Sequence, residues 1–93
     1  MDHTLHIRVE NGYEIFSIAG KSVRSTVAPV FKGYRKVLEF DPEIGYLEME
    51  TEFLLRDGTR IVDVEPISLT DMLSWSFHDP DEVIRTIEHI VLE

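Results

Sequence analysis

The stretch "YLEMETEFLLRDGTRIVDVE" (residues 46–65) contains two runs of alternating apolar and polar residues on either side of Asp57-Gly58. Alternation is typical of a β-strand, because successive side chains point to opposite faces. An Asp-Gly pair between two such runs indicates a two-residue hairpin turn. This turn sets Phe53 opposite Val62, so that apolar residues of both runs share one face. The stretch therefore predicts an antiparallel hairpin that buries one of its faces.

The second face of the predicted hairpin is acidic. The same turn places Glu52 opposite Asp63 and Glu50 opposite Glu65. Like charges that face each other across two strands are destabilising, by about as much as the ~0.2–1 kcal/mol that favourable pairs contribute. Folding alone therefore does not explain this face, which we treat as the candidate partner-binding site. Its five carboxylates are Glu48, Glu50, Glu52, Asp63 and Glu65.

Three interpretations of these carboxylates are open. Alternate side chains along a strand lie ~6.6–7 Å apart, from the rise per residue of a strand. Phosphates along one nucleic-acid strand have a similar spacing, so the face can imitate a nucleic-acid backbone toward a basic protein. The second interpretation is a solvated face whose charges discourage aggregation through strand edges. The third is a divalent-cation site, but a flat face supplies no enclosing oxygens, so we expect no metal.

The N-terminal residues predict another hairpin. Residues 4–10 alternate and lead through Asn11-Gly12 into a second alternating run. Asn-Gly is the strongest short-range hairpin signal, because a type I′ turn needs a positive φ at both positions. The resulting register places Ile7 opposite Phe16 and aligns the two apolar faces.

The segment between the two hairpins gives a weaker pattern. Residues 20–33 contain several valines, which are poor helix formers, and Pro29, which breaks a helix. We expect a loop here, with a short helix that ends before Pro29 as the alternative. Residues 34–40 are expected to form a third strand, and residues 41–45 a turn into the acidic hairpin.

Two helices are expected after the sheet, which Pro66 ends because proline cannot donate to a β-ladder. The first is a short helix within residues 68–77. In the second, Asp79 is the N-cap, Pro80 occupies the first helical position and Glu82 completes a capping box. The apolar stripe of this second helix consists of Val83, Ile84, Ile87, Ile90 and Val91.

Together these elements predict an α+β fold, in which an antiparallel meander sheet of about five strands is packed on one face by a C-terminal helix. Residues 1–93 are expected to form a single domain, because a chain of this length has no room for two independent cores. Apolar residues make up 43% of the chain, a share that argues against disorder. Trp75 is expected to close one end of the core, with an anchor of a protein interface as the alternative.

Charge is divided unevenly along the chain. The net charge is −9, with +3 on residues 1–38 and −12 on residues 39–93. A basic stretch at residues 21–36 is a candidate anion-binding site, although packing beside the acidic hairpin, within a chain or between subunits, is the favoured explanation. The overall charge opposes nucleic acid, so we do not expect direct nucleic-acid binding. The cations of this stretch are Lys21, Arg24, Lys32, Arg35 and Lys36.

Several classes of site are excluded or not expected. The chain contains no cysteine, which rules out disulfides, thiolate metal sites and cysteine nucleophiles. The N-terminus lacks the pattern of a signal peptide, and no apolar run approaches the ~20 residues of a membrane span. We therefore expect a soluble, cytoplasmic protein without membrane contact. No Gly-rich phosphate loop, nucleophile–base pair or histidine metal motif is present, so no cofactor and no catalytic residue is expected.

These observations favour a small, acidic, non-catalytic protein-binding module. Its carboxylate-rich sheet face is expected to bind a basic protein partner, and the most specific form of this hypothesis is an inhibitor or antitoxin-like protein. The alternative is a homo-oligomeric accessory or structural subunit of a larger assembly. In that case the basic half of one chain meets the acidic half of another.

Overall fold

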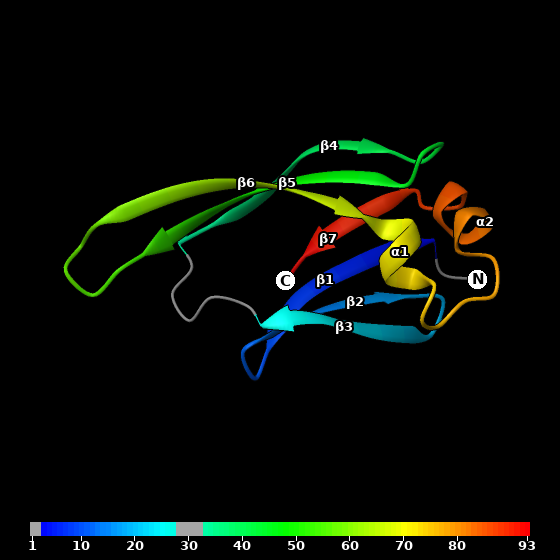
Figure 1. Cartoon of the computed structure of the whole chain (residues 1–93), viewed down its shortest axis with the longest axis horizontal. Coiled ribbons are helices and arrows are strands. Elements are labelled where there is room, and N and C mark those ends of the chain that lie inside the picture. Colours follow the sequence, from blue (N-terminus) through cyan, green and yellow to red (C-terminus); the bar gives the residue numbers. More distant parts are fainter. Residues whose placement is uncertain (1–2, 28–32) are drawn as a thin grey trace.

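The structure is a computed structural model that describes residues 3–27 and 33–93. These residues form seven strands and two short helices (Figure 1). The strands are β1 (Thr4–Glu10), β2 (Tyr13–Ile18), β3 (Lys21–Val27), β4 (Arg35–Asp41), β5 (Tyr46–Leu54), β6 (Arg60–Ser68) and β7 (His89–Leu92). The helices are α1 (Leu69–Leu73) and α2 (Pro80–Arg85).

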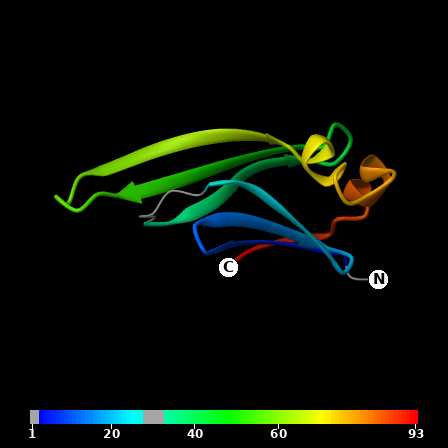
Figure 2. The same cartoon turned by 60° about the horizontal axis from the view of Figure 1, so that its bottom comes forward.

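The strands form two sheets that lie one above the other (Figure 2). Sheet A has the order β3-β2-β1-β7, and its β1 and β7 run parallel. Sheet B has the order β4-β5-β6 and is antiparallel throughout. The α+β class is therefore confirmed, but the expectation of a single five-strand meander beneath a C-terminal helix is wrong.

The core lies between the two sheets and beneath the helices. Each buried strand contributes alternate residues to it, as the period-two patterns predict. Full burial of a leucine, isoleucine or phenylalanine side chain stabilises the fold by ~1.5–3 kcal/mol. The buried apolar side chains are Leu5, Ile7, Phe16, Ile18, Val23, Leu47, Met49, Ile67, Leu69, Leu73 and Ile84.

The N-terminal hairpin forms as expected. Asn11 and Gly12 both have a positive φ, of 52° and 81°, and Ile7 pairs with Phe16. A second turn of the same kind, at Ala19-Gly20, was not predicted. It leads directly into β3, so the expected loop or short helix in residues 20–33 is wrong over β3. Residues 28–32, which include Pro29, lie outside the described residues.

The C-terminal segment begins as a helix and ends as a strand. Asp79 is the N-cap of α2 and accepts a hydrogen bond from the Glu82 backbone, as predicted. The helix ends at Arg85, however, and β7 follows, with Ile90 beside Leu5 on β1. Residues 89–92 alternate between exposed and half-buried positions, which is the period of a strand. The β-branched residues among them favour a strand. The expectation that the second helix continues through Val91 is therefore wrong.

Both helices are short, with five residues in α1 and six in α2. Ser68 is the N-cap of α1 and accepts a hydrogen bond from the Asp71 backbone N–H. A helix needs ~20 apolar residues to cross a bilayer, and no helix in residues 3–27 and 33–93 meets that requirement.

Candidate functional site

The register of β5 against β6 differs by one residue from the predicted register. The loop between them spans residues 56–58, because the Leu55 backbone N–H donates to Thr59 and that of Gly58 donates to Leu55. Gly58 has a φ of +87°, which is typical of a three-residue loop that ends in a bulge. The Asp57 carboxylate accepts from the Thr59 N–H at 2.8 Å and holds this loop. The expected two-residue turn at Asp57-Gly58 is therefore wrong.

The shifted register separates the five candidate carboxylates. Glu52 faces Val62 rather than Asp63, and Glu50 faces Val64 rather than Glu65. A shift by one residue moves every side chain of one strand to the other face, because the period of a strand is two. The prediction of one continuous acidic face on this hairpin is wrong. Glu48, Glu50 and Glu52 lie on the outer face of sheet B, whereas Asp63 and Glu65 lie on the face toward sheet A.

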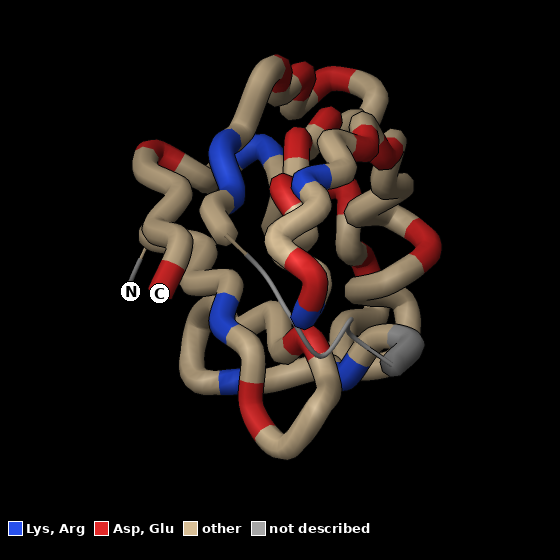
Figure 3. The backbone as a smooth tube through the Cα atoms, turned by 90° about the vertical axis from the view of Figure 1, so that its left-hand side faces the viewer, with Lys and Arg blue, Asp and Glu red and all other residues tan. Residues whose placement is uncertain are grey.

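The outer face of sheet B nevertheless remains acidic. Glu39 of β4 pairs with Glu48, and the cation Lys36 pairs with Glu50, with Nζ 3.7 Å from the carboxylate. Figure 3 shows the acidic positions concentrated in the upper half of the view, where sheet B lies. We call Glu39, Glu48, Glu50 and Glu52 the acidic face.

Two tyrosines donate hydrogen bonds to this face. Tyr34 Oη lies 3.0 Å from Glu50, and Tyr46 Oη lies 2.6 Å from Glu48. These hydrogen bonds raise the pKa of both tyrosine hydroxyls above 10.0, since a tyrosinate would face a carboxylate. The tyrosines therefore fix the direction of two carboxylates at neutral pH.

The β5–β6 hairpin extends beyond the rest of the molecule (Figures 1 and 2). Its pairing with β4 ends at Thr51, and Glu52 bonds to the backbone of Gly33 and Tyr34 just before β4, so residues 53–61 form a two-stranded ribbon, which we call the arm. Exposed apolar patches on a protein surface commonly mark interaction sites. The exposed large apolar residues of the hairpin are Leu54, Leu55, Ile61, Val62 and Val64.

β6 is an edge strand. Among the described residues it pairs only with β5, and residues 60–66 are all exposed. Hydrogen-bonded and non-hydrogen-bonded pairs alternate along an antiparallel ladder. The hydrogen bonds from Leu55 to Thr59 and from Leu69 to Gly45 show which pairs of β5 and β6 are hydrogen-bonded. The N–H and C=O groups of Val62 and Val64 therefore point away from β5.

Pro66 lies within this edge strand and does not end it. The Pro66 nitrogen points away from β5, as the backbone nitrogens of Val62 and Val64 do. The missing N–H therefore removes no hydrogen bond between β5 and β6. The expectation that Pro66 ends the sheet is wrong. β6 continues to Ser68, which is also the N-cap of α1.

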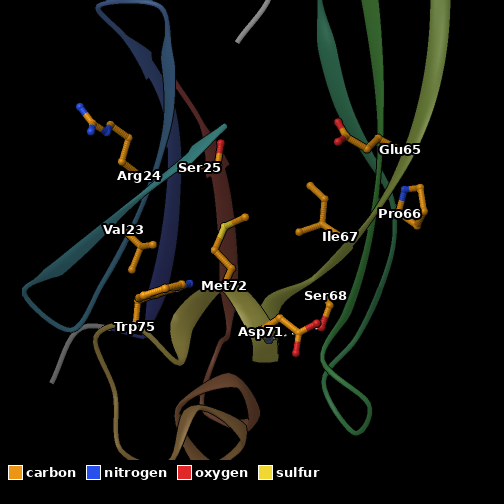
Figure 4. A pocket seen from close by; sticks show the side chains of 10 residues that line it. All are labelled: Val23, Arg24, Ser25, Glu65, Pro66, Ile67, Ser68, Asp71, Met72 and Trp75. Atoms are coloured by element: carbon orange, nitrogen blue, oxygen red, sulfur yellow. Dashed lines mark hydrogen bonds between the residues drawn. The ribbon is translucent and has the colours of Figure 1, made fainter. Parts of the chain in front are cut away.

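A groove of about 570 Å³ lies between β6 and β3, an edge strand of each sheet, above α1 (Figure 4). Val23, Ile67 and Met72 give it apolar walls, and the Glu65 side chain points into it. Trp75 stands at its border and is 86% exposed. The expectation that Trp75 closes the core is wrong.

The four candidate anion-binding residues that the structure describes are not brought together. Lys21 lies over the Phe77 ring, and Arg24 lies over the Tyr13 ring with a separation of 4.3 Å. Arg35 points into the molecule, where it forms an ion pair with Glu14 of β2. Lys36 contacts Glu50 across sheet B, and Lys32 lies outside the described residues.

The titratable side chains of the described residues do not gather into a metal-binding group. His6 Nδ1 lies 2.6 Å from a carboxylate oxygen of Glu93. Within residues 3–27 and 33–93, no three histidine or acidic side chains converge as metal ligands. The notable surface features are therefore the acidic face, the arm and the β6 edge with its groove.

The sequence patterns do not identify Val62, Val64 and Trp75 as surface residues. The register of a two-residue turn places the two valines in the core, and the small size of the domain favours a core position for Trp75 over an interface position. One signal in the sequence was available, because Pro66 within an otherwise alternating run indicates an edge strand.

No protein-family model, no curated protein and no solved structure matches this chain.

Proposed function

We propose that this protein is a non-catalytic protein-binding module that recognises a basic partner protein through sheet B. The observation that carries the proposal is the combination of carboxylates and exposed apolar residues on one hairpin. Val62 and Val64, which are 52% and 47% exposed, lie directly beside Glu52 and Glu50. Apolar contacts provide affinity, and surrounding charges select the partner and speed the encounter.

The charge of sheet B supports a basic partner. The acidic face contains four carboxylates, and among the described residues Lys36 is the one cation paired into it. Glu39 and Glu48 face each other directly, an arrangement that is unfavourable for the isolated sheet. A cationic partner surface relieves this repulsion on binding.

The row of Glu48, Glu50 and Glu52 survives the change of register. These residues alternate along β5, so their spacing remains that of a strand, ~6.6–7 Å. The inhibitor hypothesis therefore keeps its physical basis on a smaller set of residues. A module of this kind occupies a basic site that would otherwise hold a nucleic-acid backbone.

Affinity capture from the native host with paired variants tests the proposal. In the first variant, Glu48→Gln, Glu50→Gln and Glu52→Gln neutralise the acidic face while keeping the size of the side chains. The matched control neutralises three exposed acids elsewhere, Glu43, Glu82 and Glu88. A basic protein captured by the wild type and the control, but not by the first variant, is expected. Equal capture by both variants would contradict the proposal.

The oligomeric alternative is distinguished by light scattering at low and high salt. A monomer at both ionic strengths is expected for the binding module. A dimer that dissociates in salt would favour the contact between basic and acidic halves of two chains.

A further inference from the structure

We propose that the exposed edge of β6 binds its partner by β-strand addition, and that the occupant is an extended segment in which lysine or arginine alternates with β-branched apolar residues. This inference deepens the proposed function and rests on it for the basic character of the partner. It assigns the binding mode to the backbone of residues 60–66 rather than to the acidic face.

The first observation is the direction of the backbone groups. Val62 and Val64 point their N–H and C=O groups away from β5, and residues 60–66 are exposed along the whole edge. Such a row is a template for another strand unless proteins block it with charges, bulges or a cover. Among the described residues no strand pairs with it, and β5 against β6 has no bulge. The acidic side chains of Asp63 and Glu65 oppose an acidic strand but not a cationic one, and the missing N–H of Pro66 limits pairing to the stretch around Val62 and Val64. The edge can therefore accept a fourth strand of sheet B.

The second observation is the pattern of side chains along β6. On the face toward sheet A, the carboxylates of Asp63 and Glu65 form no hydrogen bond or ion pair within the described residues. On the outer face, Val62 and Val64 are about half exposed. An added strand places its own side chains opposite these two sets in alternation. Charge complementarity therefore selects cations on one face, and apolar contact selects β-branched residues on the other.

The groove between β6 and β3 lies next to this edge, on its side toward sheet A. Glu65 points into the groove, and Ile67, Met72 and Trp75 provide an apolar surface beside it (Figure 4). A long cationic side chain opposite Glu65 enters this space with its charge near the carboxylate and its methylene groups against Met72. An exposed tryptophan at the border provides a further contact of the kind that is enriched in binding hot spots.

A second copy of this chain fits the edge less well. Antiparallel pairing of two β6 strands around Val62 would set Ile61 opposite Asp63 of the other chain. The Asp63 and Glu65 carboxylates would then have no cation opposite them, and each chain has a net charge of −9. A basic segment of another protein removes both difficulties.

The test uses two lysine–valine heptapeptides with the same composition, one strictly alternating and one with the valines in a block. Binding to the full chain is measured by fluorescence anisotropy. We expect the alternating peptide to bind at least about tenfold more tightly than the block peptide. Equal affinities would overturn the inference, because charge attraction alone does not depend on the order of residues. Absence of binding by the alternating peptide would also overturn it.

Val64→Pro is the variant that separates edge pairing from side-chain contact. The substitution removes an N–H that points away from β5, at a position equivalent to that of Pro66. The hydrogen bonds between β5 and β6 are therefore kept. We expect affinity for the alternating peptide to fall about tenfold, the loss of about one backbone hydrogen bond. The matched control Val64→Thr keeps the N–H and the β-branched shape, and should retain binding. Unchanged affinity in a folded Val64→Pro variant would overturn the inference.

A modified peptide gives the same information without changing the protein. In antiparallel addition, the valine amides of the peptide donate to β6, whereas the lysine amides point away. N-methylation of the valine amides should abolish binding, and N-methylation of the lysine amides should not. Insensitivity to both modifications would overturn the inference. Hydrogen exchange gives a direct readout, because the amides of Val62 and Val64 should become protected on binding.

Two further outcomes distinguish this inference from the proposed function. If the captured basic protein is lost with the acidic-face variant but retained by Val64→Pro, the module binds through its outer face. That result contradicts this inference and leaves the proposed function standing. A wild-type dimer that Val64→Pro converts to a monomer would show a second copy on the edge, and would also overturn the inference.

Discussion

Thr51 on β5 lies directly opposite Asp63 on β6. This pair shows the register of the hairpin, and the register determines how charge is distributed over sheet B. Thr51 is 8% exposed and belongs to the inner face, so Asp63 faces inward as well. In the register of a two-residue turn, Asp63 would face Glu52 on the outer face. One additional loop residue therefore changes which carboxylates share a surface.

Cysteine pairs should report this register directly, in a chain that has no cysteine of its own. Glu52 and Val62 form a non-hydrogen-bonded pair, whose short Cα separation suits a disulfide. We expect the double variant Glu52→Cys/Val62→Cys to form a disulfide in mild oxidant. The control Glu52→Cys/Asp63→Cys should remain reduced, because its side chains point to opposite faces. The reverse result, measured by mass spectrometry, would establish the register of the two-residue turn.

The two hairpins show how far local sequence determines a register. At Asn11-Gly12 both residues have a positive φ, and the predicted pairing is confirmed. At Asp57-Gly58 only Gly58 has a positive φ, since Asp57 is held by its hydrogen bond to Thr59. Asn-Gly and Asp-Gly both indicate a hairpin, but they do not fix the number of loop residues. The sequence therefore predicted the hairpin correctly and its faces incorrectly.

The missed strand β7 depends on contacts between the two ends of the chain. Ile84, Ile87 and Ile90 fit a helical stripe, and the N-cap at Asp79 starts a helix as predicted. The parallel partner of β7 is β1, which local periodicity cannot reveal. The same limitation applies to the candidate anion site, because Arg35 is drawn into the interior by Glu14 of the other sheet.

Ala19 should be a position where glycine stabilises the protein. Its φ is +52°, in the left-handed region that costs a residue with a Cβ ~1–2 kcal/mol. We expect Ala19→Gly to raise the free energy of unfolding by ~0.5–1 kcal/mol, because part of this gain is offset by chain entropy and lost methyl contact. The reciprocal control, Gly12→Ala at a φ of +81°, should lower it by ~1 kcal/mol. Urea unfolding measures both, and a destabilised Ala19→Gly variant would contradict this account.

The ion pair between Arg35 and Glu14 connects the two sheets through nearly buried groups. Their side chains are 7% and 12% exposed, and Arg35 also donates to the Glu93 backbone carbonyl at 2.9 Å. Arg35→Met removes the guanidinium and leaves Glu14 without it, so we expect a loss of ~3–5 kcal/mol in the free energy of unfolding.

Two comparisons identify the buried charge as the cause. The double variant Glu14→Met/Arg35→Met should be more stable than Arg35→Met, because it removes both charges. Lys36→Met is the matched control: this side chain is 60% exposed, and its loss should change stability by less than ~0.5 kcal/mol. A double variant no more stable than Arg35→Met would show that packing, rather than charge, determines the cost.

Tyr34 and Tyr46 should make the stability of the acidic face sensitive to alkaline pH. Hydrogen bonds to Glu50 and Glu48 raise the pKa of the two hydroxyls above 10.0, so the folded state holds these protons more tightly than the unfolded state. Their contribution to stability is fully present below pH 10 and is lost as the pH rises through the raised values. Tyrosinate absorbance should therefore develop at higher pH in the folded chain than in the chain unfolded by urea.

Glu50→Gln supplies the discriminating measurement in a Tyr13→Phe background, where Tyr34 and Tyr46 are the tyrosines that remain. It removes the negative charge beside Tyr34, so the pKa of Tyr34 should move back toward 10.0. The pKa of Tyr46 should stay raised, because its partner is Glu48. If both absorbance transitions moved together, the shifts would reflect the general charge of the sheet, and the two tyrosines would not orient individual carboxylates.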